Sequence, residues 1–531
     1  MNATKTTPPK DWLEGLKENF SSDLSSGFSI FLLALPLSLG IAQASGIPPL
    51  MGVISAIIGG VLITFFTGCK LSIKGPAAGL IVIVAGAVSE FGGGVEGWKM
   101  AAGAMVVAGI LQIIFGVTKL GKYVDFFPLS AIHGMLAAIG LIIIAKQIPV
   151  LLNDNPSLSK GEGPFELFYD IPKFISNLDP RATLVGLVSL AIMLGWPRIK
   201  HRILSKFPAP LIVLLFAIPA GIFMNFATTE PVYTLVKVGS LIDSLAINAS
   251  FEGVSHTGVF IKYVVMLSLV GTLESLLTVK AIDLLDPYKR KSSPNQDLIA
   301  IGIGNTLSAF LGGYPMISEV ARSSANIKNG AKTRWANFFH GVFLLVFVLV
   351  AYPVLEMIPN AALAAMLISV GINLAHPKEF LHMSKIGKDQ LAIFSTTIIV
   401  TLAEDLLLGI AAGILLKLVI HTVRGVRARH LFKASVTVEN SDAENYTITI
   451  NNAALFSNYL GVKKHIDSIP GKKHIDIELS DSVKLVDHSF LDNLHHFKHD
   501  YEEEGGTVNI LGLDKLTPLS GHDLAAHKRT C

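Results

Sequence analysis

Apolar segments long enough to cross a membrane recur from Leu24 to Val423, and they constrain the fold more than any other feature. The 531-residue chain is 51% hydrophobic and 16% charged, which is too apolar for a soluble globular protein. We expect membrane-spanning helices at 24–45, 50–67, 100–117, 123–146, 183–196, 210–226, 263–285, 298–311, 338–354, 361–374, 391–402 and 406–423.

One further apolar stretch, residues 70–88, is too short and too interrupted for a plain span. It contains Pro76, and proline suits the first turn of a helix but not its interior. We therefore expect a brief extended piece that ends at Lys74, followed by a half-helix that starts at Pro76.

A second broken stretch, residues 313–326, lies between long apolar segments and contains Pro315. We expect a short helix to start near Ser318, with Arg322 about one turn further along. The first amides of a helix have no internal partner and carry a partial positive charge. A half-helix end with an arginine at membrane depth indicates an anion site. The alternative is a re-entrant packing element in which Arg322 pairs with Glu319.

The two broken stretches occupy corresponding places in the chain. The first is the third apolar segment, and the second is the tenth, hence the third of its own half. Corresponding broken helices are the best sequence pointer to the binding site of a transporter. The pattern predicts a polytopic α-helical membrane protein with about 14 segments in a 7+7 inverted repeat, with both half-helices aimed at one pocket.

Basic residues gather in alternate loops. They are Lys119, Lys122, Arg198, Lys200, Arg202, Lys206, Lys289, Arg290, Lys291, Lys328, Lys332, Arg334, Lys378, Lys385 and Lys388. Because basic loops stay on the cytoplasmic side, this bias predicts that both the N- and the C-terminus are cytoplasmic.

The composition changes near Leu431, where charged and histidine residues become frequent. We predict a cytoplasmic segment at 1–22, a transmembrane domain at 23–430 and a small cytoplasmic α/β domain at 431–531. In the last, strands are expected at 446–450, 474–479 and 507–511, with helices at 457–468 and 489–503. Cys69 and Cys531 are not expected to form a disulfide, and no basic tract suggests nucleic acid.

Short motifs are spread over nearly all of the chain after Asp23. They are Leu35-Pro36, Ile73-Lys-Gly-Pro76, Gly121-Lys-Tyr-Val124, Pro294-Asn-Gln-Asp297 with Gly302-Ile-Gly-Asn305, and Ala321-Arg-Ser-Ser-Ala-Asn326 with Gly330-Ala-Lys-Thr333. Together they resemble the SulP family, the sulfate-permease-type anion transporters and exchangers with a C-terminal STAS domain. The resemblance implies a core bundle that holds the substrate, a gate bundle, an elevator-like movement of one against the other, and a homodimer.

The same resemblance suggests which residues bind the substrate. They are Ala77, Ala78 and Gly79 at one half-helix, Ser318, Glu319 and Val320 at the other, Arg322 as a fixed positive charge, and Leu37 and Ile41 as apolar walls. Small side chains at 77–79 would let an anion approach the backbone, although small residues also serve helix packing in membranes. Glu319 places negative charge beside the pocket, and it either pairs with Arg322 or is protonated.

Glu274 lies in the middle of an apolar segment, where an acid is a candidate for proton relay. Sodium-coupled relatives have a carboxylate at this position and a hydroxyl residue where this chain has Lys74. We expect Lys74 to pair with Glu274 and to occupy the space of a sodium ion. This favours proton coupling or exchange over sodium coupling, with an inert structural bridge as the alternative.

The sequence Asp487-His-Ser489 resembles the phosphorylatable serine site of soluble STAS proteins, although helix capping explains it more simply. Neither a cofactor nor a metal site is expected, because the histidines of the tail lack a clear ligand set.

The function predicted from these features is secondary transport of a small inorganic anion of the sulfate or bicarbonate class, with a proton or a counter-anion as the coupled ion. A bacterial inner membrane is the expected location. The alternatives are a nucleobase-cation symporter and an anion channel on the same fold, whereas an enzyme is disfavoured.

Overall fold

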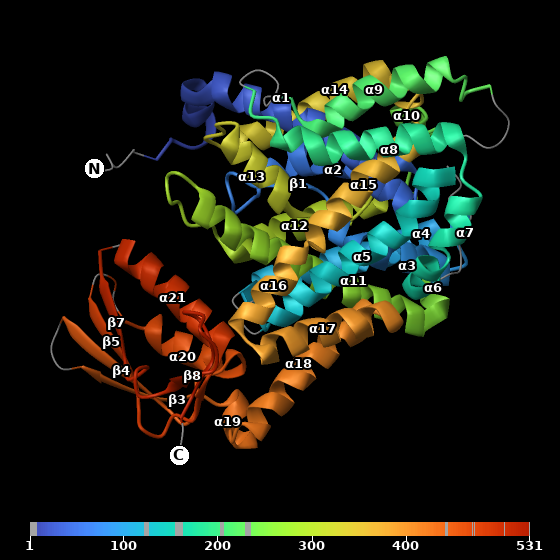
Figure 1. Ribbon diagram of the computed structural model, residues 1–531. Coiled ribbons are helices and arrows are strands. Elements are labelled where there is room, and N and C mark those ends of the chain that lie inside the picture. Colours follow the sequence, from blue (N-terminus) through green and yellow to red (C-terminus); the bar gives the residue numbers. More distant parts are fainter. Residues whose placement is uncertain are drawn as a thin grey trace. The chain divides into compact units, whose positions relative to one another are not determined.

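The computed structural model describes residues 8–121, 127–153, 163–201, 207–228, 235–440, 444–469, 471, 473–503 and 505–529 (Figure 1). The chain forms two compact units, one of Met1–Gly121 with Ile139–Leu374 and one of Lys122–Ala138 with Ala375–Cys531. Lys122, Tyr123 and Val124 of one family motif, and the loop residues Arg202 and Lys206, lie outside the described residues.

All of the expected apolar segments form helices, and the prediction of a polytopic helical protein is confirmed. They are α1 (Trp12–Ala44), α2 (Pro49–Ile57) with the turns η1 (Ile58–Leu62) and η2 (Ile63–Phe65), α4 (Gly94–Val117), α5 (Leu129–Asn153), α8 (Pro180–Gly195), α9 (Ala209–Phe223), α11 (Thr257–Leu285), α12 (Pro294–Phe310), α14 (Trp335–Leu355), α15 (Asn360–Leu374), α17 (Lys388–Ala403) and α18 (Leu406–Val423). Among the described residues, eight helices are long and apolar enough to cross a membrane, and others are shorter but apolar.

Several shorter elements connect the spans. They are α6 (Pro164–Tyr169), α7 (Ile171–Ser176), η6 (Trp196–Arg198), α10 (Leu241–Ser244), η8 (Glu252–His256) and α16 (Pro377–Ile386). At its N-terminus, α1 begins after Asp11, which caps it by accepting a hydrogen bond from the Trp12 amide at 2.9 Å.

The two broken stretches are strands followed by short helices. The first comprises β1 (Ile73–Pro76), η3 (Ala78–Leu80) and α3 (Ile81–Glu90), and the second comprises β2 (Met316–Glu319) and α13 (Val320–Lys328). The strands pair antiparallel, with Lys74 opposite Ser318 and Pro76 opposite Met316. Both helices start two residues later than predicted, because the intervening residues are held in the ladder and Ala77 and Glu319 occupy the N-cap positions.

Two close glycine contacts reflect the inverted repeat. Gly60 in the second segment packs on Gly341 in the eleventh, and a Cβ at Gly60 would lie 2.5 Å from the Gly341 Cα. Gly109 in the fourth segment packs on Gly302 in the ninth, and a Cβ at Gly302 would lie 2.7 Å from the Gly109 carbonyl oxygen. In a repeat of seven segments, the second segment corresponds to the ninth and the fourth to the eleventh. The two glycine pairs therefore occupy equivalent positions in the two halves. Only glycine allows the backbones to approach this closely in either half.

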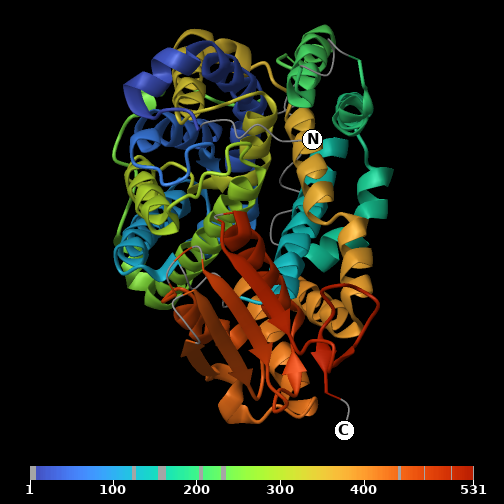
Figure 2. The same ribbon diagram turned by 90° about the vertical axis from the view of Figure 1, so that its left-hand side faces the viewer.

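The C-terminal residues form an α/β domain (Figure 2), as predicted. Its sheet has the order β3-β4-β5-β7, with β3 (Ser435–Asn440) antiparallel to β4 (Asn445–Asn451), and with β5 (His474–Leu479) parallel to both β4 and β7 (Thr507–Leu511). The prediction omitted β3. The remaining elements are α19 (Ala428–Phe432), η9 (Phe456–Asn458), α20 (Tyr459–Ile466), α21 (His488–Glu503) and a small sheet of β6 (Leu485–Val486), β9 (His527–Lys528) and β8 (Thr517–Pro518).

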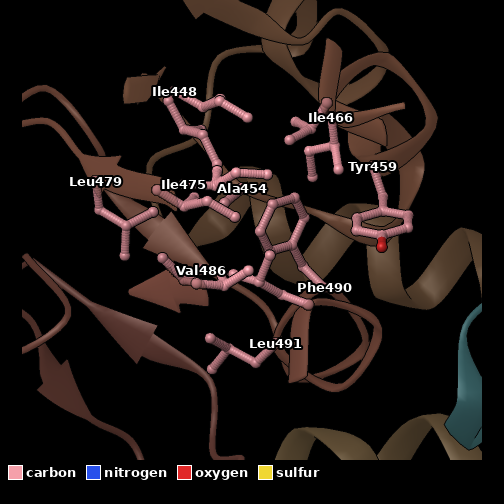
Figure 3. Close-up of a cluster of buried hydrophobic side chains, with 14 of the residues drawn as sticks. Ile448, Ala454, Tyr459, Ile466, Ile475, Leu479, Val486, Phe490 and Leu491 are labelled. Atoms are coloured by element: carbon pink, nitrogen blue, oxygen red, sulfur yellow. The ribbon is translucent and has the colours of Figure 1, made fainter. Parts of the chain in front are cut away.

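Alternating apolar residues of the strands build the core of this domain (Figure 3). Ile475 and Ile477 of β5 point to the same side as Ile448 of β4, because every second side chain of a strand shares a face. Tyr459 of α20 and Phe490 of α21 pack against them, with ring centroids 5.3 Å apart.

Candidate functional site

The paired strands bring the two short helices to one place. Helix α3 follows β1 from the end at Pro76, and α13 follows β2 from the end at Glu319, so the two helices leave the ladder in opposite directions with their N-terminal ends at it. Ala77 is fully buried, and its carbonyl accepts a hydrogen bond of 2.9 Å from the Tyr314 hydroxyl. The residues predicted at 77–79 and 318–322 therefore meet, although they are far apart in the sequence.

Arg322 is buried at this meeting point without a hydrogen-bond partner among the described residues. Its side chain is 1% exposed and packs on Gly75 of the opposite strand, where a Cβ would lie 2.5 Å from Nη1. None of its three guanidinium nitrogens has a hydrogen-bond partner among the described residues. Arg322 and Glu319 therefore form no hydrogen-bonded ion pair, although the two buried side chains interact electrostatically.

A buried charge that lacks a partner is costly, because the desolvation of an ion amounts to several kcal/mol. His340 of α14, which the sequence analysis did not single out, is also fully buried and interacts electrostatically with Arg322. Neither of its ring nitrogens has a hydrogen-bond partner among the described residues. The guanidinium of Arg322 and the ring of His340 thus have N–H groups available to donate hydrogen bonds to a small anion.

Lys74 does not pair with Glu274, and this part of the prediction is wrong. Its ammonium donates to both carboxylate oxygens of Asp297, at 2.6 and 2.9 Å, and to the hydroxyls of Ser72 and Ser318. The reason is geometric: Lys74 and Ser318 are opposite each other in the ladder, and Asp297 in the first turn of α12 lies beside this pair. All of these side chains are at most 1% exposed.

Asp297 is the residue of this network that sequence reasoning missed. It accepts further hydrogen bonds from Thr67, at 2.7 Å, and from Ser318, at 2.8 Å. The available signal was its place in the Pro294-Asn-Gln-Asp297 motif, but an acid in the first turn of a helix is ordinarily explained by the helix dipole.

Glu274 of α11 lies instead against the start of the first half-helix. A Cβ at Gly79 would be 1.9 Å from its Oε1, so only glycine fits there. Oε1 has no hydrogen-bond partner among the described residues. The structure therefore separates the two coupling candidates: Lys74 belongs to a saturated network, whereas Glu274 retains an unpartnered oxygen beside residues 77–79.

The remaining predicted site residues have varied surroundings. The Ser318 hydroxyl is used by Lys74 and Asp297, so only its backbone could serve a ligand. Val320 is 46% exposed, whereas Ile41 of α1 is buried at 2% and Leu37, one turn earlier, is half-buried. Helix α1 packs against β1 and α3, which places Leu37 and Ile41 on a neighbouring element of the half-helix.

In the C-terminal domain, Asp487 caps α21 by accepting a hydrogen bond of 2.7 Å from the Phe490 amide, as the capping interpretation predicted. Ser489 is not a cap. Its hydroxyl accepts a hydrogen bond of 2.9 Å from Lys417 of α18, and both side chains are at most 1% exposed. Burial opposes ionisation of Asp487, but the charges of Lys417 and His421 outweigh it and hold the pKa of this carboxyl below its usual value.

The described histidines and acidic residues contain no group of three or more that could hold a metal ion. The arrangement at the half-helices is instead typical of a membrane transport protein, because two helix N-termini and a buried cation lie together where two spans are broken.

Comparison with known proteins identifies the family. Residues 20–397 match the sequence profile of the Sulfate permease family, and the chain belongs to this family. It is 27% identical over 505 residues to the putative sulfate transporter YvdB of Bacillus subtilis, covering 93% of this chain and 92% of the relative. It is also 27% identical over 403 residues to the bicarbonate transporter BicA of Picosynechococcus sp., covering 75% of this chain and 69% of the relative.

Solved structures agree with this assignment. The transmembrane domain of a cyanobacterium bicarbonate transporter BicA matches 75% of this chain and 97% of its own, with a TM-score of 0.64 and 25% identity. SLC26A9 matches 93% of this chain and 84% of its own, with a TM-score of 0.69, and at 18% identity it supports the fold alone. The protein is therefore a multi-pass membrane transporter of an anion transporter family, and not an enzyme, and the α/β tail is compatible with a STAS domain.

Proposed function

We propose that the protein is a secondary active transporter of a small inorganic anion, of the sulfate or bicarbonate class, bound where the two half-helices meet. The observation that carries this proposal is Arg322, a buried cation with no described hydrogen-bond partner beside two helix N-termini. Backbone amides at Ala77, Ala78 and Gly79 and at Glu319 and Val320 would bind the anion, with Leu37 and Ile41 as apolar walls that strengthen the electrostatics.

Coupling to protons, or exchange of anions, fits the site better than coupling to sodium. The oxygens of Ser72, Asp297 and Ser318, which could have bound a cation, already surround the Lys74 ammonium. Two carboxyls of the site remain, those of Glu274 and Glu319, and Glu274, whose Oε1 has no described hydrogen-bond partner, is the candidate for taking up a proton.

The movement would be elevator-like. The β1–β2 ladder joins both half-helices in one block, which would move as a core against the helices of the gate. The basic loops support cytoplasmic N- and C-termini in a bacterial inner membrane, and resemblance to the family supports a homodimer with domains at 1–22, 23–430 and 431–531.

Radiolabelled sulfate and bicarbonate uptake into proteoliposomes, under imposed proton and sodium gradients, tests this proposal. We expect saturable uptake that responds to the proton or counter-anion gradient and not to sodium. Arg322→Gln should raise the apparent KM by tenfold or more, about 1.4 kcal/mol, whereas Arg181→Gln, which changes an exposed arginine of α8, should not. Non-saturable flux would indicate a channel, and strict sodium dependence would contradict the coupling proposed here.

A further inference from the structure

A cavity lined in part by polar residues lies at the C-terminal end of α3, away from the N-terminal end of this half-helix at the ladder. Its volume is about 600 Å³, and it is lined by the C-terminal parts of α1 and α3, by α5 and by the N-terminal part of α15. Gly46 and Gly92 at its rim are exposed. Its lining on α1 begins at Gly40, the residue before Ile41.

Among the described residues, Lys146 supplies the charge of this cavity. Of the described residues that line it, Lys146 is the one charged side chain, and no acidic residue lies among them. The ammonium forms neither an ion pair nor a hydrogen bond with any described residue, and no described charged group perturbs it. Lys146 lies seven residues before the end of α5, roughly 10 Å of helix.

Unpartnered amides accompany this charge. Gln43 donates to the Oδ1 of Asn360 at 2.7 Å, which leaves the Nδ2 of Asn360 without an acceptor among the described residues. Asn360 is 1% exposed and lines the cavity, as does Gln147, which is 8% exposed. A buried amide donor that lines the same cavity as an unpaired ammonium lacks an acceptor, and a small anion would supply one.

We propose that this cavity is a second, outer anion-binding site, in which Lys146 and the Nδ2 of Asn360 capture a small inorganic oxyanion before it reaches the half-helices. A cleft with low-dielectric walls and charge of one sign concentrates counter-ions and raises their association rate. The inference rests on the proposed transport function and on the proposed orientation, by which this end of the protein faces outward. Lys146 would act on entry from outside and not on release to the cytoplasm.

Side-specific kinetics test this inference. Uptake into intact cells that lack their own sulfate transport reports the outer face, and uptake into inverted membrane vesicles reports the inner face. We expect Lys146→Gln to raise the apparent KM for external sulfate about tenfold, equivalent to about 1.4 kcal/mol, with Vmax and the KM from the inner face within about twofold. The effect should be larger for divalent sulfate than for bicarbonate, because the Coulomb energy scales with charge.

Two variants complete the design. Lys146→Arg keeps the charge and should restore most of the external affinity, whereas Lys99→Gln, a lysine of α4 that does not line the cavity, should change nothing. An unchanged external KM in Lys146→Gln would overturn the outer site while leaving transport itself established. An equal loss on both faces, or a loss in Vmax alone, would also overturn it, since that is the signature of a structural role. Absence of anion uptake by the unmodified protein would instead contradict the proposed function.

Discussion

Two buried cations lie at the same two-stranded ladder, and their surroundings differ completely. Lys74 in β1 is surrounded by oxygens, with Asp297, Ser72 and Ser318 all within hydrogen-bonding distance. Arg322, just beyond β2, has no described hydrogen-bond partner on any nitrogen. Two carboxylates repeat the contrast, since Asp297 is saturated whereas Glu274 has an unpartnered oxygen.

The difference separates structural from functional charge. A buried ion with several partners holds elements together, and the loss of one partner leaves an uncompensated charge. A buried ion without partners has not been satisfied by the fold, and intramembrane ions of this kind usually mark the path of a solute. The following substitutions test this distinction, from the largest expected effect to the smallest.

Asp297→Asn should be the most destabilising of these substitutions. It leaves the Lys74 ammonium buried without a counter-charge, which costs about 3 to 5 kcal/mol. We expect a large fall in the thermal unfolding midpoint of the detergent-solubilised protein. The double variant Lys74→Met with Asp297→Leu should recover much of this loss. As a control, Glu96→Gln removes the acid of the partly exposed pair with Lys99 and should cost at most about 1 kcal/mol. Equal falls in the unfolding midpoint for Asp297→Asn and Glu96→Gln would contradict the structural role assigned to the Lys74–Asp297 pair.

Gly79→Ala tests the close contact with Glu274. The added Cβ would lie 1.9 Å from Oε1, so either η3 or α11 must shift, at a cost of about 1 to 3 kcal/mol. Transport should be lost, while the additional change Glu274→Ala should restore stability by making room. Gly195→Ala in α8, where no atom lies within 4 Å, is the matched control and should be neutral or slightly stabilising. Normal transport by Gly79→Ala would show that the two elements are not in tight contact.

Asp11→Asn tests a partly buried ion pair. Its burial is intermediate between that of the Lys74–Asp297 pair and that of the Lys99–Glu96 pair. Asp11 accepts hydrogen bonds from Arg334 at 2.9 and 2.8 Å. Partial burial opposes its ionisation, but Arg334, the Trp12 amide and Lys70 outweigh this and hold the pKa of Asp11 at about 2. Because the pKa is lower in the folded state, the stabilisation is present above about pH 4 and is lost as the pH falls toward 2.

The unfolding midpoint of Asp11→Asn should therefore be lower than that of the unmodified protein at pH 7, by an amount equivalent to about 1 to 2 kcal/mol. This difference should narrow below pH 4. A difference that stays constant from pH 7 to pH 3 would contradict the role of the carboxylate charge.

Arg322→Gln should have the smallest effect on stability, within about 1 kcal/mol of the unmodified protein, because Arg322 forms no hydrogen bond to a described residue and the loss of its electrostatic attraction to Glu319 is offset by the lower cost of burying a neutral side chain. The same variant should lose anion affinity. Comparison of its unfolding midpoint with that of Asp297→Asn is the most direct test of the contrast between the two cations. A drop as large as that of Asp297→Asn would show that Arg322 is structural.

The sequence predicted the broken segments because Pro76 and Pro315 interrupt stretches that are otherwise apolar, and proline acts locally. It also predicted that residues 77–79 and 318–322 belong to one site, since both segments hold the same place in the two halves. These predictions depend on order along the chain and need no knowledge of side-chain directions.

The partner of Lys74 could not be predicted in this way. Lys74 and Asp297 are 223 residues apart, and their contact depends on which face of β1 the side chain takes. A shift of one residue in a strand reverses that face. The resemblance directed attention to Glu274, whereas the register of the ladder places Lys74 opposite Ser318 and beside Asp297. The charge of Lys146 in the cavity at the C-terminal end of α3 was not predicted either, because in the sequence Lys146 is one polar residue near the end of an apolar segment.

The ladder between β1 and β2 has a consequence for discrimination among solutes. Hydrogen-bonded strands are about 4.8 Å apart. This distance changes far less than the position of a side chain that can adopt another rotamer. The half-helix ends are tethered to these strands directly, through Pro76 and Glu319. The size of the anion site would thus be set by the main chain of the ladder. A change in the preferred anion would have to come from the side chains that line the site.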